Sequence, residues 1–272
     1  MFNDKLQQIR EDLECSRSWL SQVQANKFQR TQSASLEIPQ SSVEIISVHV
    51  PKTAGSFFNS VLQQVYEKNL FNDYKEQIHP VLFHVLKAIP QAKSELINNF
   101  ISANIKAIHG HFPIAKYEGY FPKSKRVVWL RNPIQRIISA YYFILSESAT
   151  WAADPVSKFI AEINLDIYDF VELPAMQNQI YNYYCRGRDL SEFDFVGIHE
   201  YITEDIIELK HLMKWPDFTL QRVNDNKYPN YHDNLSTLMN DRKLIEKISL
   251  LNKEDMYLYE LALKLREKRS KS

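Results

Sequence analysis

Short apolar runs alternate along the chain with longer amphipathic stretches. Three of these runs are rich in β-branched and aromatic residues and are short enough for buried strands: Val43–Val50, Arg126–Leu130 and Phe193–Ile198. The stretches between them repeat apolar residues every three or four positions, which is the spacing of a helix face. Because buried strands that alternate with helices form parallel sheets, the pattern predicts an α/β fold. We expect three layers, with a central, mostly parallel sheet flanked by helices.

The first 42 residues have a different pattern. Residues 1–30 carry a stripe of side chains spaced alternately by three and four, which predicts a helix: Leu6, Ile9, Leu13, Ser16, Leu20 and Val23. We favour packing of this stripe on the chain's own domain; the alternative is a short coiled-coil seam that makes a homo-oligomer. The polar segment Thr31–Ser42 predicts a linker. The expected division is therefore an N-terminal helix and linker at 1–42 and a catalytic domain at 43–272.

Most of the remaining chain has a helical pattern. Asn69–Asn104 is predicted to be mostly helical, and the short apolar run Ile105–Ile108 to be a further strand. Thr203 is expected to cap a helix in the C-terminal part. A last helix is predicted to open at Asn252, and from Arg266 onward we expect a basic tail.

The amino-acid composition argues against several classes of binding partner. Lys+Arg and Asp+Glu balance at 33 each in 272 residues, so no overall field attracts nucleic acid or an anionic membrane. The two cysteines, Cys15 and Cys185, cannot form a disulfide framework, which favours a reducing compartment. The charged N-terminus is unlike a signal peptide, and no stretch approaches the ~20 apolar residues of a membrane-spanning helix. We therefore expect a soluble, cytoplasmic protein with no nucleic-acid partner.

The turn after the first predicted strand has the features of an anion site. Pro51 ends the strand, the turn Lys52–Ser56 follows, and the next apolar residues share one helix face: Phe57, Phe58, Val61, Leu62 and Val65. Free backbone N–H groups and the positive helix end point at one spot there, which favours a phosphate. In the GxxxxGK[ST] motif of nucleotide hydrolases the lysine comes after the loop, whereas here it comes first. An ordinary strand–helix turn is the alternative.

A second candidate anion site follows the strand Arg126–Leu130. The dipeptide Asn132-Pro133 suits the cap and the first residue of a helix. The apolar residues of that helix cluster on one face: Ile134, Ile137, Ile138, Tyr141 and Leu145. Arg136 and Ser139 fall on the opposite face. Arg131 at the strand end and Ser139 suit a second anion, while Arg136 is interpreted as a solvated or salt-bridged surface arginine.

Two histidines, His109 and His111, flank Gly110 directly after the short strand Ile105–Ile108. α/β sheets bind ligands at the carboxyl ends of their strands, so both are candidate site residues. The alternative is a loop with one hydrogen-bonded structural histidine. A metal site is disfavoured, because no third Cys, His or acidic ligand lies at a supporting spacing. Farther along, Met176–Tyr184 is dense in amides and tyrosines, which suits hydrogen bonding to sugars or the wet face of an ordinary helix.

With both motifs in view, the chain resembles the PAPS-dependent sulfotransferases, most closely the carbohydrate branch around heparan-sulfate 2-O-sulfotransferase. Pro51–Phe57 resembles the turn that holds the 5′-phosphosulfate of 3′-phosphoadenosine 5′-phosphosulfate (PAPS), and Arg131–Tyr141 resembles the segment that holds its 3′-phosphate. The resemblance implies a P-loop-like fold, PAPS as the donor substrate, and these donor-binding residues: Lys52, Thr53, Ala54, Gly55, Ser56, Phe57, Arg131 and Ser139. Phe57 stands where the family often has a hydroxyl, so that contact is expected from the backbone alone.

The resemblance also implies the catalytic residues. His109-Gly110-His111 is similar to the family's HGH segment, in which a histidine acts as the base. His111 is the preferred base, with His109 second or orienting it, and Lys52 is the third catalytic residue. Two later segments, VGIHEYITEDIIEL and NKEDMYLYELA, resemble the family's late strand and closing helix. The resemblance covers most of residues 43–266.

The chemistry of sulfuryl transfer agrees with these roles. Negative charge grows on the leaving phosphate oxygen, where Lys52 and the helix start can stabilise it. The attacking hydroxyl loses a proton, which suits a histidine. No magnesium is required, and we expect no metal. The sequence thus predicts a sulfotransferase that acts on a hydroxyl of a carbohydrate acceptor; the alternatives are a P-loop-type nucleotide kinase or NTPase and a non-catalytic nucleotide-binding module.

Overall fold

The structure is a computed structural model that describes residues 43–74, 100–147, 158, 160, 162–163, 165–220 and 228–271. The chain divides into two units, Met1–Gln40 and Ser41–Ser272, and all the described residues belong to the second. The predicted N-terminal helix, its seam and the linker lie outside the described residues.

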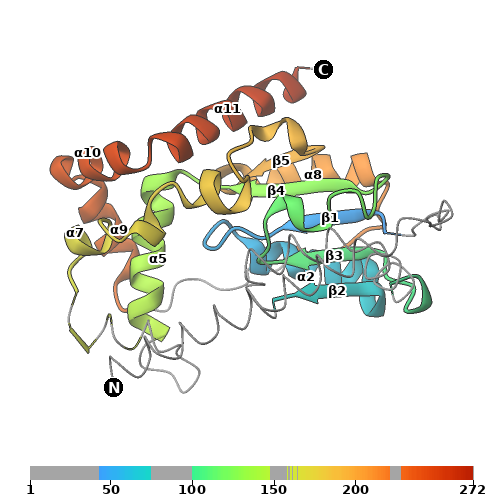
Figure 1. Ribbon diagram of the computed structural model, residues 1–272, viewed down its shortest axis with the longest axis horizontal. Helices are drawn as coiled ribbons and strands as arrows, with labels where there is room; N and C mark the ends of the chain where they lie inside the picture. The colour runs from blue at the N-terminus through green and yellow to red at the C-terminus, as the bar shows by residue number, and fades with distance from the viewer. Residues whose placement is uncertain are drawn as a thin grey trace, which may run out of the picture. The chain divides into compact units, whose positions relative to one another are not determined.

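A five-stranded parallel sheet forms the centre of the second unit (Figure 1). Its strands are β1 (Ile45–Val48), β2 (Leu70–Asp73), β3 (Ala107–Gly110), β4 (Lys125–Leu130) and β5 (Phe195–Ile198). Their order is β2-β3-β1-β4-β5, and every neighbouring pair is parallel. Val48 lies opposite Gly110 on one side and Val128 on the other. The chain segments that leave β1, β3 and β4 therefore begin at the same edge of the sheet.

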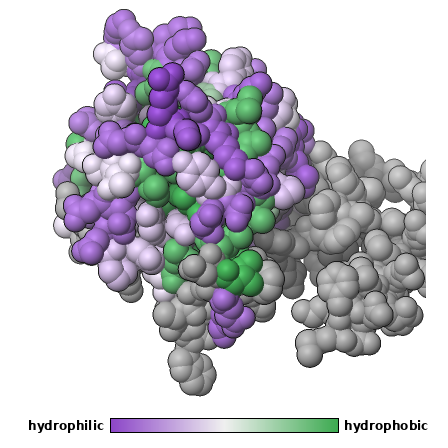
Figure 2. All heavy atoms as spheres, turned by 90° about the vertical axis from the view of Figure 1, so that its left-hand side faces the viewer, coloured by the Kyte–Doolittle hydropathy of each residue, from purple (hydrophilic) through white to green (hydrophobic). Residues whose placement is uncertain are grey.

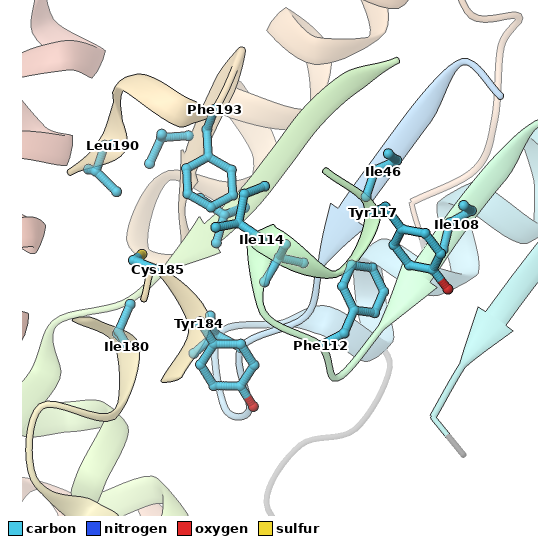
Figure 3. Packing of buried hydrophobic residues seen from close by; sticks show 14 of the residues in the cluster. Ile46, Ile108, Phe112, Ile114, Tyr117, Ile180, Tyr184, Cys185, Leu190 and Phe193 are labelled. Atoms are coloured by element: carbon cyan, nitrogen blue, oxygen red, sulfur yellow. The ribbon is translucent and has the colours of Figure 1, made fainter. Parts of the chain in front are cut away.

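Helices cover both faces of the sheet, so the predicted α/β fold is confirmed. On one face, α2 (Gly55–Tyr66) and α8 (Ile202–Met213) pack on the side chains of Ile45, Val127 and Phe195. On the other face, α11 (Lys253–Ser270) and the connecting segments pack on Ile46, Val128 and Val196. Figure 3 shows part of this second cluster, with Ile46 and Ile108 of the sheet and Phe112, Ile114 and Tyr117 beside them. Because both faces are buried, the strands β1, β4 and β5 are mostly apolar.

A third cluster lies around α5 (Pro133–Glu147). Three further helices pack with it: α7 (Ile167–Phe170), α9 (Tyr231–Met239) and α10 (Arg242–Leu251). Asn132 caps α5 as predicted, since its Oδ1 accepts hydrogen bonds from the backbone N–H groups of Ile134 at 3.0 Å and Gln135 at 3.2 Å. Figure 2 views the molecule from this end; hydrophilic side chains dominate the face, with apolar ones between them.

Short helical segments complete the described part of the chain. Five are 3-10 helices, at Glu67–Asn69, Ile114–Tyr117, Pro174–Met176, Leu190–Glu192 and His199–Tyr201. One is a π-helix at Ile180–Tyr184.

Two sequence predictions about local structure were wrong, and one strand was not foreseen. β2 lies inside Asn69–Asn104, which was predicted to be mostly helical; its four residues become a strand through pairing with β3, more than thirty residues downstream. α8 begins at Ile202 and its N-cap Tyr201 makes no side-chain bond, so Thr203 is not the cap. The chain from Arg266 is no tail, because α11 continues to Ser270 and the Arg266 Nε donates to Asp205 Oδ1 at 2.6 Å.

Candidate active site

The turn between β1 and α2 has an unusual backbone. Lys52 and Ala54 both adopt left-handed φ angles, 67° and 71°. Between them, the buried Thr53 donates its hydroxyl to the Val50 carbonyl at 2.8 Å, which fixes the turn from inside. Ala54 is the N-cap of α2 and has no side-chain acceptor to offer the first N–H groups of the helix. A turn of this kind presents successive backbone N–H groups on one concave side, the arrangement that binds anions.

Arg131 lies directly against this turn. Its guanidinium donates from NH1 to the Lys52 carbonyl at 3.4 Å, and only 8% of the side chain is exposed. The Lys52 ammonium lies 3.9 Å from the ring centroid of Phe143 on α5. The two motifs predicted to bind anions therefore meet at the edge of the sheet. Ser139, two turns into α5, is buried at 2% exposure.

Arg136 is not the surface arginine that the helix pattern predicted. It is 1% exposed, donates to Gln179 Oε1 at 2.8 Å, and lies 3.6 Å from Asp255 Oδ2 on α11. Burial lowers the pKa of Arg136, and the nearby Asp255 carboxylate opposes that shift. The prediction failed because α5 is buried on the face of Arg136 and Ser139 as well as on its isoleucine face.

The two histidines of the HGH segment lie in different environments. His109, on β3, is completely buried, and its Nδ1 lies 2.8 Å from the Ser47 hydroxyl on β1. His111 follows the strand, is exposed, and donates its backbone N–H to the Asp73 carbonyl at 3.2 Å. Only His111 of the pair is thus accessible to a substrate.

A third histidine, His49, completes this group and was missed by the sequence analysis. Its ring is stacked on His109 with a centroid distance of 5.0 Å and lies 4.4 Å from His111. Its Nδ1 lies 2.9 Å from the Tyr74 hydroxyl. The position of His49, directly after β1 and two residues before Pro51, was the available signal, because residues that follow parallel strands gather at one edge.

Burial keeps these imidazoles neutral. Desolvation, helped by the neighbouring histidines and Lys52, lowers the pKa of His49 to about 2. Desolvation and the charge of His111 lower the pKa of His109 to about 3, although the Gly55 backbone raises it. The pKa of His111 is lowered by partial desolvation alone. A histidine whose pKa lies below its ordinary value is unprotonated at neutral pH and is able to accept a proton.

Acid is expected to destabilise the protein through His49 and His109. Unfolded, each ring takes up a proton near pH 6.5; folded, it does so only near pH 2 to 3. Between these limits the unfolded state binds more protons, so stability is complete above pH 6.5 and falls as the pH falls. From pH 6.5 to 5 each ring accounts for up to about 2 kcal/mol. Urea unfolding at pH 7 and pH 5 measures the loss, and His109→Asn, which keeps a polar partner for Ser47, should make it smaller. Equal pH dependence in both proteins would contradict the assignment.

A cleft of about 450 Å³ opens beside the histidines. His49, His111 and Tyr74 form one part of its lining. The other part is the polar face of α2, with side chains spaced by three and four residues: Ser56, Asn59, Ser60 and Gln63. Phe57, predicted to help bind the donor, has its side chain against the apolar cluster between α2 and the sheet. Every side chain that lines the cleft carries a polar group.

Three of the four amides in the segment Met176–Tyr184 are hydrogen-bonded within the protein. Gln177 donates to the Glu172 carbonyl at 2.8 Å, and Asn178 Oδ1 accepts from the backbone of Glu254 at 2.9 Å. Gln179 accepts from Arg136. The fourth amide, Asn182, is exposed.

The described part of the chain bears on metal binding and on membrane insertion. Among these residues, no group of three or more His, Cys, Asp or Glu side chains is arranged to hold a metal ion. None of the described helices is both long enough and apolar enough to span a bilayer.

Comparisons with known proteins agree with the resemblance at the family level. No curated protein sequence matches the chain. Among solved structures, a sulfotransferase from Alicyclobacillus acidocaldarius matches at 14% identity, covering 77% of this chain and 95% of that one, with a TM-score of 0.35. The mouse sulfotransferase SULT7A1 complexed with PAP matches at 13% identity, covering 85% of this chain and 90% of that one, with a TM-score of 0.37. The model of the sulfotransferase family matches residues 40–262, which is most of the sequence, and the chain therefore belongs to the sulfotransferase family.

Proposed function

We propose that this enzyme transfers the sulfuryl group of PAPS to a hydroxyl of a carbohydrate. The observation that carries the proposal is the left-handed turn Lys52–Ala54 at the start of α2, one residue from a polar cleft that contains His111. Each non-glycine residue in this conformation costs about 1–3 kcal/mol. Single residues of this kind flank helices elsewhere, for example Lys214 and Asn230, whereas two of them stand within three residues in this turn. The N–H groups of Gly55 and Ser56 then bind the 5′-phosphate of the donor.

Lys52 acts at the leaving phosphate oxygen, and His111 acts at the acceptor hydroxyl. The sulfur–oxygen bond to the donor phosphate breaks as the bond from the acceptor oxygen forms, and the electron pair stays on the phosphate oxygen. Lys52 stabilises that oxygen; its long stem lets the ammonium leave Phe143 for a phosphate. The acceptor proton passes to the His111 imidazole, which is exposed at the cleft and neutral at pH 7.

The cleft favours a hydroxyl-rich acceptor. Hydroxyl groups of Ser56, Ser60 and Tyr74 and the amides of Asn59 and Gln63 line it, so an acceptor with several hydroxyl groups can form hydrogen bonds there. A sugar ring offers both donors and acceptors over its whole edge. The cleft volume of about 450 Å³ is in the range of small-ligand sites.

Arg131 and Ser139 are proposed to bind the 3′-phosphate, the group that distinguishes PAPS from AMP and ATP. A charge-assisted hydrogen bond contributes about 1.5–3 kcal/mol. Arg131→Ala is therefore expected to weaken binding of 3′,5′-adenosine bisphosphate about ten- to over a hundredfold, while AMP affinity barely changes. Calorimetry with both nucleotides measures this, and Arg131→Lys is the matched control that keeps the charge.

Parallel losses for both nucleotides would mean a different role for Arg131. Its hydrogen bond to the Lys52 carbonyl would then be the important contact, and the 3′-phosphate site would lie elsewhere.

The proposed function is tested with labelled PAPS and a panel of acceptors. Sugars should become labelled, whereas a phenol and a long-chain alcohol should not. Omitting magnesium and adding EDTA should leave the rate unchanged, since the chain's own residues bind the donor. Transfer to phenols alone would contradict the acceptor class, and a strict requirement for ATP and magnesium would contradict the donor.

A further inference from the structure

The His49 ring is held from three sides. It is stacked on the buried His109 at 5.0 Å with an angle of 16° between the rings. Its Nδ1 lies 2.9 Å from the Tyr74 hydroxyl. Its other edge lies against the first residue of α2, because a Cβ atom placed on Gly55 would come within 1.8 Å of His49 Cδ2 and Nε2. A ring with a stacking partner, a hydrogen-bond partner and a backbone contact has one orientation.

His111 lies on the remaining side of that ring. The centroids of His49 and His111 are 4.4 Å apart with an angle of 56°, and Tyr74 touches His111 edge-on at 4.9 Å. All three side chains line the cleft. His49 and Tyr74 therefore form a wall behind His111 and leave its cleft side open.

We infer that His49 is a positioning residue, whose ring holds the His111 imidazole at the cleft and excludes water from one of its faces. This inference rests on the proposed function only in the role it gives to His111. It also explains why glycine stands at position 55, since any larger residue would displace the His49 ring.

The charged and titratable groups around His49 favour its neutral form. His109 and His111 face it from β3 and the segment after it, Lys52 from the turn, and Tyr74 from the end of β2. The two histidines and Lys52 each oppose protonation of His49, and burial opposes it most, so the pKa of His49 lies far below neutrality. When His111 takes up a proton, the proton stays there instead of spreading to His49.

The first test measures the His111 pKa directly. Protein labelled at its histidine nitrogens is titrated by NMR, with the His111 signal assigned from His111→Ala. His49→Ala removes the wall, so the His111 pKa should rise toward its ordinary value of 6.5. His49→Phe keeps a flat ring of similar size, so the pKa should stay low. His211→Ala, which removes an exposed histidine on α8, is the control and should leave the His111 pKa unchanged.

The second test follows the reaction. In His49→Ala the acid side of the pH profile of kcat/KM should move to higher pH, and kcat at pH 8 should fall about 10- to 100-fold, because a small misplacement of a base is costly. The affinity for adenosine bisphosphate should not change. Tyr74→Phe, which removes the hydroxyl but keeps the ring, should show a smaller loss of kcat.

The two tests separate failure of this inference from failure of the proposed function. An unchanged His111 pKa in His49→Ala would overturn the inference, whatever the activity. If the His111 pKa rises in His49→Ala but His111→Ala is fully active, the inference about His49 holds and the proposed role of His111 as the base is wrong. If His49→Ala does not fold, His49→Asn is titrated instead, and the same outcomes apply.

Discussion

We expect Lys52→Ala to remove nearly all sulfotransferase turnover and to leave the protein folded. Loss of one preorganised group at a developing negative charge reduces kcat about 10²–10³-fold. The fold should survive, since the Lys52 ammonium lies over Phe143, whose ring is 40% exposed. The measurement is kcat at saturating PAPS, together with the thermal midpoint of each variant.

Lys52→Gly is the matched control for backbone strain. Glycine relieves the left-handed conformation at φ 67°, which alanine does not, so the glycine variant should be the more stable of the two. Both should be equally inactive if the ammonium is the catalytic feature. A normal rate of Lys52→Ala with saturating donor would exclude the proposed role.

His111→Ala and His109→Ala are expected to fail in different ways. His111 is exposed, so its removal should reduce turnover about 10²–10⁴-fold, the usual contribution of a positioned base, with little effect on stability. His109 is fully buried beside Ser47, so its removal should lower the free energy of unfolding by about 1–3 kcal/mol. Turnover and urea unfolding, measured on both variants, separate the two effects.

His109→Asn keeps a polar group near Ser47 and is the control for the second variant. It should recover part of the stability that His109→Ala loses. Near-normal turnover of His111→Ala, combined with an inactive but well-folded His109→Asn, would exchange the assigned roles.

The parts of the fold that sequence predicted correctly depend on local information. β1, β4 and β5 are apolar on both faces, so each is recognisable without knowledge of its neighbours. Asn132 caps α5 through its own side chain and the next two N–H groups. Parallel strands end at the same edge of the sheet, and in the structure this arrangement places Arg131 beside the Lys52 turn.

Several features that the sequence did not reveal are defined only by distant contacts. β2 is a strand because β3 pairs with it. Arg136 is buried because it forms an ion pair with Asp255, which lies on the last helix and far away in the sequence. The polar residues of α2 have the spacing of an ordinary solvated helix face. They line a cleft only because residues that follow β1, β2 and β3 lie beside them in the folded protein. No pattern within α2 carries that information.

The order of strands in the sheet also affects synthesis of the protein. Among the described strands, β1 leaves the ribosome first, yet it lies in the middle, and its neighbours β3 and β4 begin about 60 and 80 residues later. At about 5–20 residues per second, the apolar segment around β1 stays unpaired for roughly 3–12 s. During that interval the nascent chain exposes a strand that is a ready partner for other chains. Residues 43–50 are therefore expected to bind ribosome-associated chaperones during that interval, well before the active site exists.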